Sequence, residues 1–445
     1  MNNDLLARLD RIPVWALPRR FIAIIGLGYF FVFYDIADIG FALPAIAEQF
    51  HLSSAQSLFV AVAVGLVGYA VGSLGIGSLA DRFGRYRMLI VTMTLTAIGS
   101  FGDAAAQGVV SLVVFRFITG IGVGADLNLV STYISELAPA RLRGRISVLT
   151  FLIGIVGQAI TPFLALALVP NFTYGWRLLF GIGGIIALLG LFVRLALPES
   201  PRWEVEHGRL ESAERTIAQM EAHCVARGVT LPEPEPMSTV SAPPVIGFGA
   251  LMRAPYRRRL AVFISMWFLW YIGNYGFLGD AAELIKAHGA PIGGSIMYLA
   301  IGALGYPVGA ALMLAVVDHV ERRVLLLGAA VVWCAGMLAI GSYASEAWII
   351  GGAFLAAVAL GSFLQVAYTF TAESFPTSAR ATGFALSDGI GHAGGAVGAI
   401  CLPLVVSSTS FFTGFAVIGL TGLLAGLVAM LGPVATGRRL EAVSS

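Results

Sequence analysis

The stretch LLFGIGGIIALLGLFVRLAL, residues 178–197, carries a single charged side chain, Arg194. A helix rises 1.5 Å per residue, so a run of roughly 20 apolar residues covers the ~30 Å hydrocarbon core of a bilayer. A closed β-barrel, the other structure that spans membranes, is built from short alternating strands and not from continuous apolar runs. This stretch therefore predicts a membrane-spanning helix.

The composition of the whole chain excludes a water-soluble globule. Of its 445 residues, 58% are hydrophobic and 12% are charged, whereas a soluble domain carries about a quarter charged residues. The formal net charge of +2 indicates no basic surface of the kind that binds nucleic acid. We therefore expect a lipid bilayer around most of the outer surface and no nucleic-acid partner.

Further apolar runs of the same length predict an all-α membrane protein with twelve transmembrane helices. We expect these helices at residues 20–44, 56–80, 88–107, 110–133, 146–168, 176–197, 260–285, 292–316, 323–343, 346–370, 380–405 and 410–432. One long polar stretch separates the sixth run from the seventh and divides the twelve into two sets of six. The expected parts are an N-terminal segment at 1–19, a first bundle at 20–197, a central loop at 198–259, a second bundle at 260–432 and a tail at 433–445.

Basic residues gather in alternate loops. Arg8 and Arg11 precede the first run, Arg82 and Arg85 follow the second, and Arg143 follows the fourth. Loops on the cytoplasmic side of a membrane are enriched in Lys and Arg, so both termini and the central loop are expected in the cytoplasm. We expect a multi-pass protein of the bacterial inner membrane. No cleavable signal segment precedes the first run, which we interpret as a retained anchor.

An internal repeat indicates two related halves. Asp81 and Asp318 are 237 residues apart (318 minus 81), and three further pairs of charged residues have the same separation. These pairs are Arg85 with Arg322, Glu136 with Glu373, and Arg143 with Arg380. Parallel repeats of this kind are typical of secondary transporters, whose two halves surround a central binding site.

The sequence shows no pattern for enzymatic, ATP-driven or metal chemistry. Cys224, Cys334 and Cys401 form no CxxC pair, so neither a zinc site nor a disulfide framework is expected. No GxxxxGK[ST] phosphate-binding loop is present, and no Ser/His/Asp or Cys/His arrangement is evident. We therefore expect no enzyme activity, no cofactor and no metal.

Four motifs resemble those of a known family. Residues 77–87, GSLADRFGRYR, resemble the signature loop between helices 2 and 3 of the major facilitator superfamily. Residues 116–124 resemble its helix-4 signature, and residues 133–145 and 198–203 resemble its sugar-porter-like branch. The resemblance implies the major facilitator fold, in which two six-helix bundles expose a central site to each side of the membrane in turn.

Within that superfamily, the chain looks closer to organic-acid and nicotinate-type transporters than to hexose porters. Residues 267–275 lack the glutamines that sugar porters carry early in helix 7, and residues 431–438 lack the motif that follows their helix 12. Asp35 and Asp38 fit the Asp-x-x-Asp pattern in helix 1 of the organic-acid relatives. His392 stands where those relatives often carry Arg in helix 11.

Three charged residues within membrane helices are candidates for proton coupling, namely Asp35, Asp38 and Arg116. An ionisable group in the bilayer is costly and by default indicates a functional site. Asp35 and Arg116 lie at overlapping depths by helical rise, and they resemble the proton-coupling pair of sugar–proton symporters. A nearby Arg keeps a buried carboxylate ionised, so separation of the pair favours proton uptake by the Asp. The alternative is a permanent structural ion pair.

Polar and aromatic residues within the membrane helices are candidates for substrate binding, because pockets combine apolar walls with a few placed polar groups. They are Tyr34, Asp126, Asn128, Gln158, Trp270, Asn274, Tyr275, Gln365, Asp388 and His392. Aromatic residues of membrane helices also pack or lie at interfaces without binding a ligand. Asp126 has a second interpretation as a fixed ion pair. Asp388 and His392 are four residues apart and share one helix face, and His392 is alternatively a packed residue.

Charged residues at the cytoplasmic ends of the helices are candidates for a gating network. They are Asp81, Arg82, Arg85, Glu136, Arg143, Asp318, Arg322, Glu373 and Arg380. In the superfamily that the chain resembles, such networks hold the outward-facing state and break on inward opening. The alternative is a solvated basic face, since exposed ion pairs contribute little to stability.

Taken together, these features predict a monomeric secondary transporter that works by alternating access. The expected substrate is a small organic solute, in particular a carboxylate or aromatic acid, that moves by symport with protons. The alternatives are a proton-coupled exporter of drugs or metabolites, a sugar transporter and, as another class, a membrane sensor that binds solute without moving it. A sensor predicts a sizeable soluble signalling domain, which the chain lacks.

Overall fold

The computed structural model describes residues 2–52, 64–139, 141–234, 248–288, 292–438 and 443. The described residues are helical wherever they are regular and contain no strand. Twelve segments are long and apolar enough to cross a membrane, which confirms the predicted all-α fold. The predicted beginning of the second helix, residues 56–63, lies outside the described residues.

Each half of the chain contributes six of these segments. The first half contains α2 (Arg20–Phe50), α4 (Val64–Phe83), α5 (Arg85–Ala105), α6 (Val109–Leu137), α7 (Arg143–Leu168) and α8 (Gly175–Arg194). The second half contains α12 (Tyr256–Ala287), α13 (Ile292–Ala303) continued by α14 (Gly305–Val316), α15 (Arg322–Ser342), α16 (Glu346–Glu373), α17 (Arg380–Gly391) continued by α18 (Ala393–Ser408), and α19 (Phe411–Ala429). The breaks within the eighth and eleventh segments fall at Leu304 and His392.

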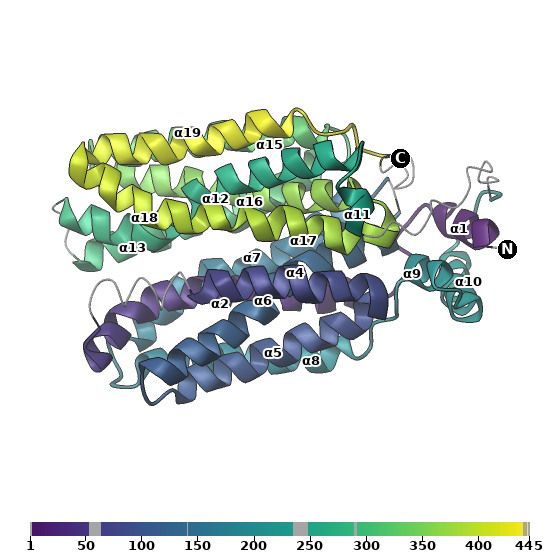
Figure 1. Ribbon diagram of the computed structural model, residues 1–445, viewed down its shortest axis with the longest axis horizontal. Helices are drawn as coiled ribbons and strands as arrows, with labels where there is room; N and C mark the ends of the chain where they lie inside the picture. The colour runs from purple at the N-terminus through teal and green to yellow at the C-terminus, as the bar shows by residue number, and fades with distance from the viewer. Residues whose placement is uncertain are drawn as a thin grey trace.

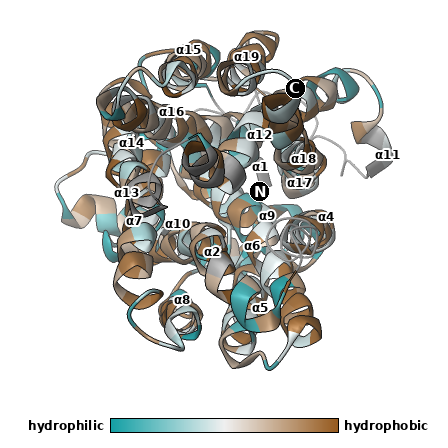
Figure 2. Cartoon of the chain, turned by 90° about the vertical axis from the view of Figure 1, so that its left-hand side faces the viewer, coloured by the Kyte–Doolittle hydropathy of each residue, from teal (hydrophilic) through white to brown (hydrophobic). Residues whose placement is uncertain are grey.

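The two halves lie side by side as separate bundles with parallel long axes (Figure 1). In the end view, hydrophobic residues cover much of the outer faces of both bundles (Figure 2). Large apolar side chains such as Leu189, Phe192 and Leu420 are exposed there. Many exposed large apolar side chains on membrane-length helices indicate a surface for lipid and not for water.

Short helices cover one end of the molecule, which we call the terminal face. It carries α1 (Asn2–Asp10), α9 (Pro201–Glu206) and α10 (Leu210–Ala226), together with both ends of the chain (Figure 1). Arg8 and Arg11 join α1 to α10 through Glu221, at 2.8 and 2.6 Å. Burial opposes the ionisation of Glu221, but the hydrogen bonds from the two guanidinium groups outweigh it and lower its pKa.

Glycines allow the backbones of α4 and α6 to touch. A Cβ at Gly72 would lie 1.9 Å from the carbonyl oxygen of Ile121, and a Cβ at Gly124 would lie 2.2 Å from that of Tyr69. Backbone atoms of a packed helix cannot move aside as a flexible side chain can. Small residues at these contacts therefore set the distance between the two helices, as is common in membrane bundles.

We expect Gly72→Ala to lower the free energy of unfolding by ~1–3 kcal/mol, because the new methyl group must push α4 and α6 apart. The measurement is the apparent melting temperature of the purified protein in detergent. Gly75→Ala is the matched control, since Gly75 is on the same helix and a Cβ there meets nothing within 4 Å. Equal melting temperatures for the two variants would contradict this role of Gly72.

Candidate functional site

A pocket of about 300 Å³ lies between the two bundles. The first half contributes Phe33 and Ile36 from α2, Leu127 from α6 and Gln158 from α7. The second half contributes Tyr271, Asn274, Tyr275 and Leu278 from α12, Leu360, Leu364 and Tyr368 from α16, and His392. Because both halves line it, a change in their relative position alters the pocket directly.

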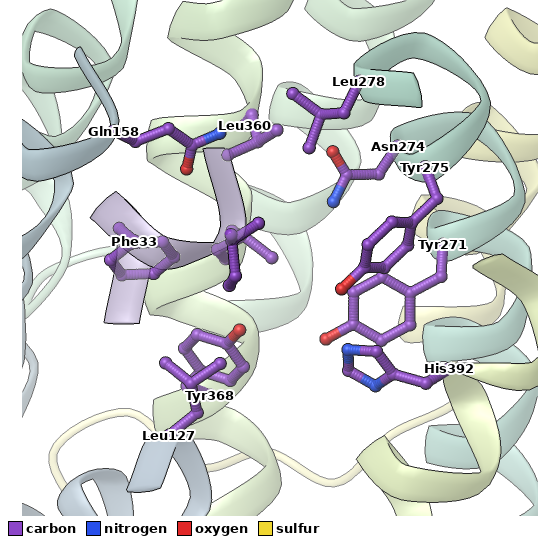
Figure 3. A pocket seen from close by; sticks show the side chains of 12 residues that line it. Phe33, Leu127, Gln158, Tyr271, Asn274, Tyr275, Leu278, Leu360, Tyr368 and His392 are labelled. Carbon is purple, nitrogen blue, oxygen red and sulfur yellow. The ribbon is translucent and has the colours of Figure 1, made fainter. Parts of the chain in front are cut away.

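The pocket combines aromatic faces with a few polar groups. Gln158 lies on one side, and Asn274, Tyr275, Tyr271 and His392 lie on the other (Figure 3). The side-chain oxygen of Asn274 is buried and has no hydrogen-bond partner. No Asp, Glu, Lys or Arg is among the twelve lining residues, and His392 is their one basic side chain. This lining suits a small planar molecule with one polar end.

His392 is held at the break between α17 and α18. Its Nδ1 lies 2.8 Å from the backbone carbonyl oxygen of Asp388. A carbonyl oxygen only accepts, so Nδ1 carries the hydrogen and Nε2 is the nitrogen left for a ligand. The ring stacks on Tyr69, with 3.6 Å between centroids, and its centroid lies 3.9 Å from that of Tyr271. The imidazole therefore has one fixed orientation and one available nitrogen.

Asp388 lies behind this histidine and links the two halves. Its carboxylate accepts a 2.7 Å hydrogen bond from the hydroxyl of Tyr69 and a 2.6 Å hydrogen bond from that of Tyr271. Tyr69 belongs to α4 of the first half, whereas Tyr271 and Asp388 belong to the second. Asp388 does not line the pocket, so it positions residues that do.

Six sequence candidates for substrate binding do not line the pocket. They are Asp388, described above, and Tyr34, Asp126, Asn128, Trp270 and Gln365. The hydroxyl of Tyr34 donates to the carbonyl of Leu179, and the ring of Trp270 stacks on Phe363 at 3.7 Å. The amide of Asn128 donates to the hydroxyl of Ser73. Each of these three side chains turns toward a neighbouring helix. Both amide atoms of Gln365 are buried without a hydrogen-bond partner.

Asp126 forms a buried ion pair with Arg194 on α8. The Nη2 atom of Arg194 lies 2.8 Å from Oδ2 of Asp126, and Nη1 contacts Oδ1. The hydroxyl of Thr92 donates to the same Oδ1 at 2.6 Å. This geometry corresponds to the fixed pair, and Asp126 does not line the pocket. Sequence analysis left Arg194 without a role, because only the fold shows which residue faces it.

A second buried cluster surrounds Arg116 within the first half. Its Nη1 atom lies 3.3 Å from Oδ1 of Asp35, with a hydrogen bond, and 3.8 Å from Oδ1 of Asp38. A third carboxylate, that of Asp103 on α5, lies 3.9 Å away. Asp103 was not among the residues predicted from the sequence, although an acid within an apolar run is itself a signal. The structure places the three proton-coupling candidates together and adds a fourth charged residue.

The fold agrees with comparisons to known proteins. The profile of the sugar (and other) transporter family matches residues 21–445. The chain belongs to this family. It is a multi-pass membrane transporter and not an enzyme. Two transporters of Acinetobacter baylyi are similar to it along most of their length. The niacin transporter NiaP is 28% identical over 99% of both chains, and the 4-hydroxybenzoate transporter PcaK is 30% identical over 85% of this chain and 83% of its own.

Solved structures show the same fold. The proton:xylose symporter XylE, bound to 6-bromo-6-deoxy-D-glucose, matches this transporter with a TM-score of 0.78 at 24% identity. The match covers 95% of this chain and 98% of the XylE chain. It therefore extends over the whole two-bundle architecture.

An ion-pair network ties the two halves of the transporter together at the terminal face. Glu136 of the first half contacts Arg85 of its own half and Arg380 of the other half, both at 3.0 Å. Its repeat partner Glu373 contacts Arg322 of its own half at 3.3 Å and Arg143 of the other at 3.2 Å. Each half thus supplies one carboxylate and one arginine to the other. All six of these side chains are buried, so the solvated alternative does not describe them.

Of the remaining gating candidates, two make further contacts between the halves and one lies outside the network. Asp81 lies 3.0 Å from Arg85 and accepts hydrogen bonds from the backbone and hydroxyl of Thr382 in the other half. Asp318 accepts a hydrogen bond from the backbone N–H of Arg145 at 3.1 Å. Arg82 is exposed and lies outside the network, with its guanidinium 5.3 Å from the ring of Phe83.

Glu199 caps the N-terminus of α5 at the terminal face. Its Oε1 atom accepts hydrogen bonds from the backbone N–H groups of Arg85 and Tyr86, at 2.9 and 3.1 Å. These are unpaired donors at a helix N-terminus, where a carboxylate is favourable. Burial nevertheless raises the pKa of Glu199. Gly84 is required beside it, because its φ is +105° and a Cβ there would lie 2.1 Å from Oε2 of Glu199.

Proposed function

We propose that this transporter is a proton symporter for a small aromatic carboxylate, which it carries by alternating access. The observation that carries the proposal is the pocket between the halves, where tyrosine rings surround two amides and a single histidine. A monomer contains the whole pocket. Relatives named for niacin and 4-hydroxybenzoate support this class of substrate over a hexose.

The pocket offers distinct places for the two ends of such a molecule. The rings of Tyr271, Tyr275 and Tyr368 provide faces for a planar aromatic body. The amides of Gln158 and Asn274 can donate to a carboxylate, as can His392 at Nε2 once it is protonated. These three groups hold the carboxylate end of the solute, and the coupled proton binds separately at Asp35 beside Arg116.

The structure corresponds to one stage of alternating access. In the described part of the chain, the hydrogen bonds and ion pairs between the halves lie at the pocket or between it and the terminal face. We propose that the terminal face is cytoplasmic, in agreement with its many basic residues, and that the membrane is the bacterial inner membrane. The network of Glu136 and Glu373 then closes the cytoplasmic side, and inward opening requires its rupture.

The function is tested by solute uptake into proteoliposomes with an imposed pH gradient. Nicotinate, benzoates, small aliphatic carboxylates and hexoses are compared. We expect an inward proton gradient to drive accumulation of an aromatic carboxylate and not of a hexose. Uptake that is independent of the proton gradient would contradict symport. Accumulation of solute driven by an outward proton gradient would indicate the proton-coupled exporter instead.

The pocket is tested by Tyr275→Ala. Loss of one stacking face should cost ~1 kcal/mol, which raises KM for the aromatic carboxylate about fivefold. The matched control is Tyr174→Ala, because Tyr174 is 63% exposed and does not line the pocket. An unchanged KM in the pocket variant would remove Tyr275 from the substrate site.

A further inference from the structure

Asp103 is a buried carboxylate for which the proposed transport cycle has so far given no role. It is fully buried on α5, and its Oδ1 atom has no hydrogen-bond partner. Its Oδ2 atom lies 3.9 Å from Nη1 of Arg116. The hydroxyl of Thr119, one turn after Arg116 on α6, lies 3.2 Å from the same oxygen and 2.9 Å from the carbonyl oxygen of Phe115, and can donate its one hydrogen to either. Asp103 therefore faces Arg116 from a different helix than Asp35.

The charges around Arg116 do not balance when all groups are ionised. One guanidinium faces the carboxylates of Asp35, Asp38 and Asp103. Three negative charges against one positive charge leave a buried excess of two, which a low-dielectric interior strongly disfavours. The cluster therefore holds protons, and their number changes when any one of the carboxylates changes its partner.

Among the residues that the structure describes, the neighbours of the cluster supply no further charge to it. From α8, the ring of Phe180 lies 5.9 Å from the guanidinium carbon of Arg116. The nearby Arg177 binds the carbonyl oxygen of Ala104 and covers the ring of Trp176. From α4, Gly65 faces the guanidinium. Tyr34 on α2 donates its hydroxyl to a carbonyl of α8. The balance of charge thus rests on the three carboxylates and Arg116.

All four groups of the cluster belong to the first bundle. Movement of one half against the other does not by itself separate Asp35 from Arg116. A second partner for the guanidinium within the same bundle solves this problem, because the arginine can then leave Asp35 without becoming a buried unpaired cation. Asp38 serves less well, since it is one turn from Asp35 on the same helix. Asp103 lies on another helix and has its own hydrogen-bond donor.

We propose that Asp103 is the counter-ion that holds Arg116 while Asp35 carries the transported proton; this rests on the proposed proton symport. In the first state, Asp35 and Asp103 are ionised, Asp38 is protonated and the cluster has a net charge of −1. A proton from water then forms an O–H bond on Asp35, the ion pair with Arg116 breaks, and the guanidinium pairs with Asp103. The cluster is now neutral. Release of the proton to water on the other side restores the first state.

The test is the external pH at which uptake is half-maximal in proteoliposomes. In Asp103→Asn, Arg116 has lost its second partner and stays with Asp35, so protonation of Asp35 requires a higher proton concentration. We expect the half-maximal pH to fall by roughly one unit, a tenfold change in proton concentration. Exchange of labelled for unlabelled solute, which needs no net proton transfer, should be retained. Asp103→Glu, which keeps the carboxylate, should restore most of the wild-type profile.

Two further variants complete the test. Ser100→Ala is the control, because Ser100 lies one turn earlier on α5, is buried and has no hydrogen-bond partner; its pH profile should match the wild type. Thr119→Val removes the donor to Asp103 and should shift the profile in the same direction by roughly threefold in proton concentration. Thr119→Val also tests the proposal if Asp103→Asn does not fold.

Three results would overturn the proposal. The first is a wild-type pH profile in Asp103→Asn or, if that variant does not fold, in Thr119→Val. The second is an equal loss of exchange and of gradient-driven uptake in Asp103→Asn, which indicates a purely structural role. Both leave the proposed function intact as long as the wild-type protein accumulates solute on a pH gradient. The third is a wild-type protein without such accumulation, which removes the proposed function and this inference together.

Discussion

Asp35→Asn is expected to abolish accumulation of solute against its gradient while solute exchange continues. The carboxylate of Asp35 lies within 3.3 Å of Arg116 and is buried. An arginine beside it favours the ionised form, and burial without the arginine favours the neutral form. Asparagine resembles the neutral acid and binds no proton. The variant therefore permits the movements of the loaded carrier but cannot couple them to a proton gradient.

The measurement compares two assays on the same proteoliposomes. Gradient-driven accumulation should fall at least tenfold, to the level of equilibration, whereas exchange of labelled for unlabelled solute should stay within about twofold of the wild type. Asp4→Asn is the matched control, because Asp4 is an exposed residue of α1. Accumulation at the wild-type level in Asp35→Asn would place the proton site elsewhere.

Arg194→Met is expected to destabilise the protein severely. It leaves the carboxylate of Asp126 buried with only the hydroxyl of Thr92 as a donor. Removal of one partner from a buried ion pair costs ~3–5 kcal/mol. We expect a lower apparent melting temperature in detergent and a lower yield of folded protein in the membrane. Arg87→Met, at an exposed arginine on α5, is the control and should melt like the wild type.

A double variant separates a structural role of Asp126 from a functional one. Asp126→Leu together with Arg194→Met removes both charges, and replacement of a buried pair by apolar residues is often neutral or stabilising. The double variant should recover most of the stability and retain the wild-type KM for solute. A stable double variant with a KM raised tenfold would instead return Asp126 to the substrate site.

Motifs near the ends of helices pointed to charged residues that the structure brings into contact at the terminal face, with Arg82 as an exception. The repeated pairs of Asp, Arg and Glu identified the network residues, and the structure adds that Glu136 and Glu373 each accept an arginine from the opposite half. The candidates for the substrate site were harder to choose. Trp270 and Tyr271 are neighbours in the sequence, yet only Tyr271 lines the pocket. Successive residues on a helix point about 100° apart, so which one faces the pocket depends on how the helix is rotated.

The sequence by itself determined the number of membrane helices, their division into two halves and the family. Each of these three features follows from the apolar length of a segment or from a motif within it. Apolar length and motifs do not depend on which helices become neighbours. Only the tertiary structure decided that Arg194 faces Asp126, that Asp103 joins Asp35 at Arg116, and that His392 lies between Tyr69 and Tyr271. A buried charge or ring is satisfied by groups on other helices, and the packing of those helices, set by contacts such as Gly72 against α6, determines which groups come within reach.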